Sequence, residues 1–135
     1  MKGDDIAEKL LAVAKAAIAL TDGMPRTAAG RHVAGQLLQC ATSCGANYEE
    51  ARGAESRADF VHKLAISRKE AQETRFWVRL CFATKLANAA KFPGLEGEIE
   101  SVCRILGKSV ATARKRAKVK RSLPVDDDSC AVRSW

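Results

Sequence analysis

Two histidines and a scattering of carboxylates are the side chains of this 135-residue chain best suited to holding a metal ion. A carboxylate-bridged metal pair in a helical bundle needs a Glu from each of two helices and a Glu-x-x-His motif from each of the other two. The nearest approximation is Asp59-x-x-His62, and His32 lacks an acid three residues before it. Because the ligand set is incomplete, we expect no metal ion and no other cofactor.

The candidate nucleophiles are five cysteines, namely Cys40, Cys44, Cys81, Cys103 and Cys130. Cys40 and Cys44 lie one helical turn apart, without a histidine or acid at a spacing typical of an activated nucleophile. The glycines follow neither common phosphate-loop pattern. An odd number of cysteines within helical patterns is also unlike a secreted disulfide framework. We predict small buried hydrophobes in a reducing compartment, and a protein that is not an enzyme and has no catalytic residues.

Positive charge is the strongest chemical signal, because the net charge is +7 and much of it falls near one end of the chain. Residues 114–121, RKRAKVKR, contain six cations and no acid, and three aspartates follow at 126–128. Like charges this close repel one another, so an anionic ligand would stabilise the cluster. Nucleic-acid phosphate is the natural candidate. The predicted nucleic-acid contacts are Arg104, Lys108, Arg114, Lys115, Arg116, Lys118, Lys120 and Arg121.

The absence of aromatic residues from this basic run limits what it can recognise. Without stacking platforms, we expect RNA or DNA to be bound with weak sequence preference. A solvated helix end that binds nothing specific is the alternative, because cations at a helix C-terminus complement the helix dipole. Arg68, Arg75 and Arg79 recur at helical spacing and offer another face on which phosphates could lie.

Four helices must position these groups, since apolar residues recur at three-and-four spacing in four stretches. We place the second helix at about 27–52, the third at 57–90 and the fourth at 95–118. The predicted inward residues are, in chain order, Ile6, Leu10, Val13, Ala17 and Leu20; Val33, Leu37, Ala41, Cys44, Tyr48 and Ala51; Phe60, Leu64, Ser67, Ala71, Thr74, Val78 and Cys81; and Ile99, Val102, Leu106, Val110, Ala113 and Ala117.

The breaks between the helices are short. Gly53 predicts a left-handed helix stop, and Ser56 with Asp59 three residues on predicts the next helix start. Residues 91–94, KFPG, end the third helix. Short connections make successive helices antiparallel neighbours. We therefore predict an all-α, up-down four-helix bundle over residues 1–118, followed by a mobile tail at 119–135.

No run of about 18 uncharged apolar residues is present, so we expect no membrane span. The apolar segment at 10–20 is interrupted by Lys15 and preceded by acids, which is unlike a secretory signal. We expect a cytoplasmic protein.

A second apolar stripe lies outside the predicted core and consists of Ile66, Trp77 and Leu80. Aromatic residues are enriched where subunits meet, so we predict that this stripe is an oligomer interface. The alternative is that it flanks a broad core face of the third helix.

The stretch at 36–79 resembles the family known simply as four helix bundle proteins, which includes proteins encoded by intervening sequences of bacterial 23S rRNA genes. The matching words are Gln36-Leu37-Leu38, Gly45-Ala46-Asn47-Tyr48-Glu49-Glu50-Ala51, Glu55-Ser56-Arg57-Ala58-Asp59-Phe60, His62-Lys63-Leu64, Lys69-Glu70 and Glu73-Thr74-Arg75. The resemblance implies a bacterial protein, a four-helix bundle and a ring-shaped homopentamer. It implies no defined activity.

A related branch, the accessory protein of diversity-generating retroelements, is similar in fold and works as a basic pentamer beside a reverse transcriptase and its RNA. This chain resembles it less closely, through Arg75-Phe76-Trp77-Val78-Arg79-Leu80 and Arg104-Ile105-Leu106-Gly107. The resulting hypothesis is a non-catalytic, nucleic-acid-binding accessory protein, with a reverse transcriptase or another protein as a further candidate partner. The alternative is a structural adaptor, a scaffold ring that binds a protein.

Overall fold

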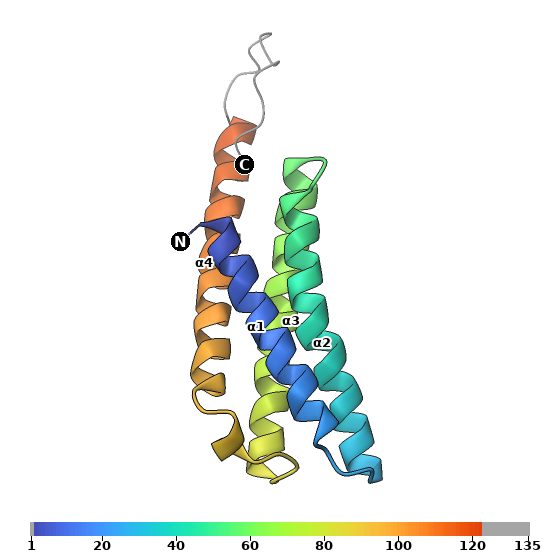
Figure 1. Cartoon of the computed structure of the whole chain (residues 1–135). Helices are drawn as coiled ribbons and strands as arrows, with labels where there is room; N and C mark the ends of the chain where they lie inside the picture. Colours follow the sequence, from blue (N-terminus) through green and yellow to red (C-terminus); the bar gives the residue numbers. More distant parts are fainter. Residues whose placement is uncertain (1, 123–135) are drawn as a thin grey trace.

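The computed structural model describes residues 2–122 of the chain. This part contains four α-helices and one short 3-10 helix, joined by turns, and no strand. The helices are α1 (Gly3–Asp22), α2 (Ala28–Arg52), α3 (Arg57–Ala83) and α4 (Leu95–Ser122), with η1 (Ala89–Lys91) before α4. Successive helices run in opposite directions and pack side by side (Figure 1). The predicted all-α fold is confirmed, and the helices follow an up-down order.

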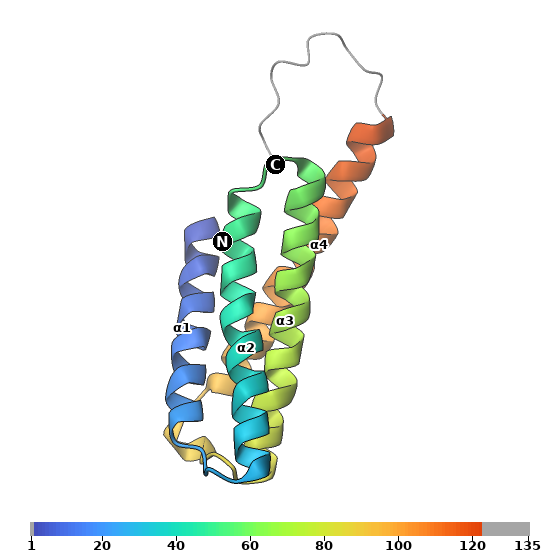
Figure 2. The ribbon, with the colours of Figure 1, turned by 90° about the vertical axis from the view of Figure 1, so that its right-hand side faces the viewer.

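The core lies where one apolar stripe from each helix meets the other three. All of the inward residues predicted on α1 and α2 are buried, together with Cys40 and Gly30. The prediction holds on α3 and α4 except at one end of each, where Phe60 and Ala117 are only half-buried. These two residues lie at the same end of the bundle, where the last turns of α4 diverge from α3 (Figure 2).

Side-chain caps begin α2 and α3. The Thr27 hydroxyl accepts the backbone N–H of Gly30 at 3.1 Å, and the Ser56 hydroxyl accepts that of Asp59 at 3.0 Å, as predicted for α3. Gly30 is required for close approach, because a Cβ there would lie 2.0 Å from the carbonyl oxygen of Pro25. The turn from α1 therefore packs directly against the first turn of α2.

The predicted left-handed stop at Gly53 is wrong. Its φ is −97°, and its N–H donates to the Glu49 carbonyl at 3.2 Å, so an ordinary backbone bond ends α2. Left-handed φ values occur at Lys85 and Gly94 instead, among the described residues.

The predicted end of the third helix near residue 90 is also wrong, because α3 ends at Ala83. The segment that follows favours helix by composition, but it turns at Lys85, whose φ is 60°. Phe82 then stacks on Phe92 with ring centroids 6.4 Å apart. Burial of these rings across the end of the bundle outweighs the intrinsic helix propensity of the segment.

At its far end α4 continues to Ser122, four residues beyond the predicted boundary at 118. The rest of the predicted tail, residues 123–135 with Cys130, lies outside the described residues. Within residues 2–122, no helix is long and apolar enough to cross a membrane.

Several polar residues of the stretch at 36–79 make contacts that hold the helices together. The Tyr48 hydroxyl donates to the Gly3 carbonyl at 3.2 Å, and Arg52 pairs with Asp4, so both tie the end of α2 to the start of α1. Lys63 Nζ lies 2.8 Å from Glu50 Oε2 and links α3 to α2. These contacts hold the end of α2 against the start of α1 and the early part of α3.

Candidate nucleic-acid interface

A groove opens between the first turns of α3 and the last turns of α4, and has a volume of about 1010 Å³. Its floor is apolar and is formed by Ala58, Val61, Ala65 and Ala117. Its walls carry six cations, namely Arg57, Arg114, Lys115, Lys118, Lys120 and Arg121. We call this feature the α3–α4 groove. No acidic side chain is among the described residues that line it.

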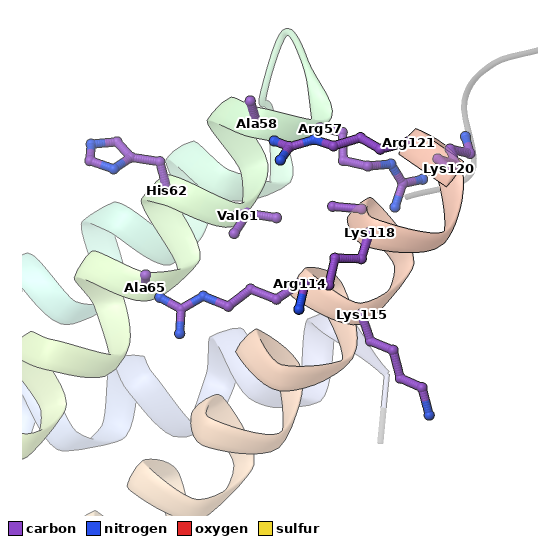
Figure 3. Close-up of a pocket in the computed structure, with 11 residues that line it drawn as sticks. Arg57, Ala58, Val61, His62, Ala65, Arg114, Lys115, Lys118, Lys120 and Arg121 are labelled. Atoms are coloured by element: carbon purple, nitrogen blue, oxygen red, sulfur yellow. The ribbon is translucent and has the colours of Figure 1, made fainter. Parts of the chain in front are cut away.

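The divergence of α4 from α3 produces this groove. Ala113 is the last buried residue of α4, and every residue from Arg114 to Ser122 except Ala117 is exposed. Small residues on the facing sides cannot fill the widening space, whereas long cationic side chains extend into it. Figure 3 shows Arg114 reaching across to the side of Ala65, while Lys115 turns outward.

Five of the eight predicted nucleic-acid contacts line the α3–α4 groove, namely Arg114, Lys115, Lys118, Lys120 and Arg121. Arg116 does not line it, and Arg104 and Lys108 are exposed further along α4. The structure therefore brings most of the basic run to one opening and leaves the rest around the helix.

Sequence reasoning missed the contribution of α3. Arg57 and the apolar floor residues come from the start of that helix. The antiparallel order of the third and fourth helices places the start of one beside the end of the other. The predicted bundle therefore already implied that residues at the start of α3 lie near the basic run. It did not imply that α4 diverges from α3 and leaves a groove between them.

Ion pairs within residues 2–122 involve α1, α2 and α3. They join Arg52 to Asp4 and Glu49, and Lys63 to Glu50, and none involves a cation of α4. The positive charge at the end of α4 is thus not neutralised by carboxylates within residues 2–122. A site of this kind attracts anions, and its long, exposed side chains suit a backbone of repeated phosphates.

The predicted interface residues Ile66, Trp77 and Leu80 are half-buried on α3. Trp77 contacts His32 of α2 edge-on, with ring centroids 6.0 Å apart, and its Nε1–H donates to Glu73 at 3.3 Å. The neighbouring Phe76 leaves 56% of its surface exposed. This side of α3 therefore combines contacts within the chain with apolar surface that the chain leaves open.

The other candidate groups are separated from the groove or turned away from it. His62 lies at its edge and points outward (Figure 3). The described cysteines are free thiols, of which Cys103 is half-buried and the other three, Cys40, Cys44 and Cys81, are buried. Burial raises the pKa of the Cys44 thiol to about 12. Such thiols are protonated and poorly nucleophilic near neutral pH. No three His, Cys, Asp or Glu side chains within residues 2–122 are grouped so that they could hold a metal ion.

Fold and site together define a class of protein, an all-α antiparallel bundle with a cationic groove at one end. Residues 4–108 match the family described as 23S rRNA-intervening sequence protein. The chain belongs to this family, as the resemblance predicted. No curated protein matches it.

A solved structure supports the assignment. It is a protein of unknown function from the S23 ribosomal protein family of Bacteroides thetaiotaomicron, which is 30% identical to this chain. The match covers 82% of this chain and 99% of that one, with a TM-score of 0.73.

The region that matches the family stops short of the basic run. It ends at residue 108, so the five groove cations on α4 lie beyond it, whereas Arg57 and the floor contributed by α3 lie within it. Family membership thus accounts for the bundle and for one wall of the groove. It carries no information about the other wall.

Proposed function

We propose that this protein is a non-catalytic, nucleic-acid-binding accessory factor that holds RNA or DNA phosphates in the α3–α4 groove. The observation that carries this proposal is the lining of six cations and no acid, contributed by two helices. Its apolar floor contains no aromatic ring, so bases have no platform on which to stack. Binding therefore depends on charge and varies little with sequence.

Salt dependence is the first test. For single strands, log K falls with log salt concentration by about 0.7 for each phosphate neutralised, so four to six contacts give a slope of roughly −3 to −4. Changing Arg114, Lys115, Arg116 and Lys118 together to Gln should flatten the slope and weaken binding by a similar factor for every sequence. Fluorescence anisotropy with labelled strands of different sequence measures both quantities.

A matched pair of single variants tests the groove itself. Arg114→Gln and Arg116→Gln remove the same charge from the same helix end, but only Arg114 lines the groove. We expect the larger loss of affinity for Arg114→Gln. Equal losses would instead indicate diffuse attraction to the whole helix end.

A structural adaptor that binds a protein is the second candidate function. It is favoured by the exposed apolar surface at Phe76 and by the apolar floor of the groove. An adaptor should show no measurable nucleic-acid binding near 150 mM salt. In that case, an acidic protein would be the expected occupant of the α3–α4 groove.

We also propose that the chain assembles into a homo-oligomer, a ring of five being the form suggested by family resemblance. The support from this chain is the apolar side of α3, where Ile66, Trp77 and Leu80 are half-buried beside Phe76. Several copies would bring several basic grooves to one nucleic acid, which raises overall affinity without a new contact.

Light scattering tests the oligomer. Phe76→Glu or Trp77→Glu should reduce the mass while helix content stays unchanged. Leu11→Glu is the matched control, because Leu11 on α1 is 55% exposed, close to the 56% of Phe76. A monomeric wild type would exclude the interface and the pentamer together, and dissociation by Leu11→Glu alone would move the interface to α1.

A further inference from the structure

Arg68 of α3 lies across the α4 backbone at Gly107. Its Nε lies 3.6 Å and its Cζ 4.0 Å from the position that a Cβ of Gly107 would occupy. This Nε is buried and has no hydrogen-bond partner, alone in this respect among the side-chain nitrogen and oxygen atoms of the described residues. A buried guanidinium N–H without an acceptor is unfavourable, so an acceptor that enters the junction here would be stabilised.

Three further cations lie close to Arg68 or Gly107 along the two helices. Arg75 lies two turns beyond Arg68 on α3, and Arg104 and Lys108 are exposed on α4 within one turn of Gly107. Burial raises the pKa of the Cys103 thiol, and the charges of Arg75 and Arg68 act in the opposite direction. Both guanidinium groups are therefore near Cys103, on the α4 side of α3.

We call Arg68, Arg75, Arg104 and Lys108 the junction cluster. Within residues 2–122, none of the four forms an ion pair with a carboxylate. Glu100 is the acid close enough to raise the pKa of Cys103, and it lies one turn before Arg104 on α4.

The junction cluster continues the α3–α4 groove along the same pair of helices. Lys108 precedes the groove residue Arg114 by six positions, or about 9 Å along α4 at 1.5 Å per residue. From Arg104 to Arg121 the span is about 25 Å. A stacked strand carries one phosphate per 3.4 Å, so about seven phosphates fit along this length.

We propose that the junction cluster is a second phosphate-binding site, and that the ligand is a single nucleic-acid strand lying along the α3–α4 junction from the groove to Arg75. This inference rests on the proposed function. A single strand is favoured because it is flexible enough to follow the junction and to bring successive phosphates to cations of both helices. Duplex DNA is stiff over about 150 base pairs, so it contacts only the outermost cations.

Short oligonucleotides test this site, because strands of 4, 6, 8 and 12 nucleotides are short enough to report on one protomer. Arg75→Gln combined with Lys108→Gln is the informative variant, since both side chains are exposed and the fold should persist. The control is Lys69→Gln combined with Lys9→Gln, which removes the same charge from exposed positions elsewhere on α3 and on α1.

For the wild type we expect affinity to rise with length to about seven nucleotides and then to level off. The junction variant should bind the 4-mer as the wild type does, but bind the 8-mer about tenfold more weakly. Its salt slope for the 8-mer should be flatter by about 1.4, which corresponds to two phosphates. The control should match the wild type at every length.

Failure of this inference can be distinguished from failure of the proposed function. Binding that is lost in the Arg114→Gln variant but is equal in the junction variant and its control would overturn this inference and leave the proposed function standing. Tighter binding of an 8-base-pair duplex than of the 8-mer would overturn the single-strand assignment. A wild type that binds no strand at low salt would overturn both proposals.

Discussion

The two junctions that α3 makes with its neighbours differ in the size and charge of the side chains along them. Toward α2 the meeting residues are small and buried: Cys40, Cys44, Ser67 and Thr74. The Ser67 hydroxyl donates to the Cys44 carbonyl at 2.7 Å, and the Thr74 hydroxyl lies 3.2 Å from Cys40 Sγ. Small side chains let the two backbones approach, and each polar group has a partner within the junction.

Toward α4 the junction is lined by long cations. Arg68 crosses it at Gly107, and Arg57 and Arg114 flank the groove where the helices diverge. The two helices pack together as far as Ala113, and beyond it the exposed cations of α4 repel those of α3, which favours the divergence of the last turns. One side of α3 thus packs closely against α2, and the other carries the cations that the proposed function assigns to an anionic ligand.

The largest difference should appear when apolar side chains are shortened. Leu64 is 2% exposed and belongs to the core, so Leu64→Ala should lower the free energy of unfolding by about 2–5 kcal/mol. Val61 is half-buried on the groove floor, and Val61→Ala should cost much less. Urea denaturation measures both. Equal costs would mean that the groove floor is part of the core and that the two junctions do not differ.

An intermediate effect should appear at alkaline pH. Burial raises the pKa of Cys44 to about 12 and that of Cys81 to about 11, from an ordinary 9.0. Above pH 9 the folded chain keeps these protons while the unfolded chain releases them. The free energy of unfolding should therefore fall as pH rises, by up to about 1.4 kcal/mol per pH unit for each thiol.

Urea denaturation at pH 8, 9 and 10 checks this expectation. In the Cys44→Ala variant, the free energy of unfolding should fall less steeply with pH than in the wild type, because one of the two buried thiols is missing. If the variant and the wild type have the same slope, the Cys44 thiol is not shielded from solvent as the close packing against α3 requires.

The smallest effect should come from charge in the groove. Arg114 and Lys118 are like charges four residues apart on a helix, an arrangement that destabilises by about 0.2–0.5 kcal/mol. Arg114→Gln should thus slightly raise the thermal stability at low salt. The gain should vanish near 1 M salt, where the screening length is about 3 Å. A loss of stability at low salt would show that Arg114 is structural.

Lys63→Gln provides the contrast on the other side of α3. It removes the ion pair with Glu50 that joins α3 to α2, so thermal stability at low salt should fall rather than rise. A rise in both variants would mean that overall positive charge, and not its position, governs stability.

The sequence by itself determined the four helices and their inward residues, because the spacing of apolar side chains on one helix is a local property. The caps at Thr27 and Ser56 are local as well, since each hydroxyl reaches an N–H three residues away. The positive charge at the end of α4 also follows directly from residues 114–121.

Only the tertiary structure decided where α3 ends and what faces the basic run. The turn at Lys85 depends on the stacking of Phe82 on Phe92, a contact between segments on either side of that turn. The groove depends on the divergence of α4 from α3, and the position of Arg68 depends on the missing side chain of Gly107 across the junction. Each depends on how separate segments lie in space, which apolar periodicity along a single helix does not encode.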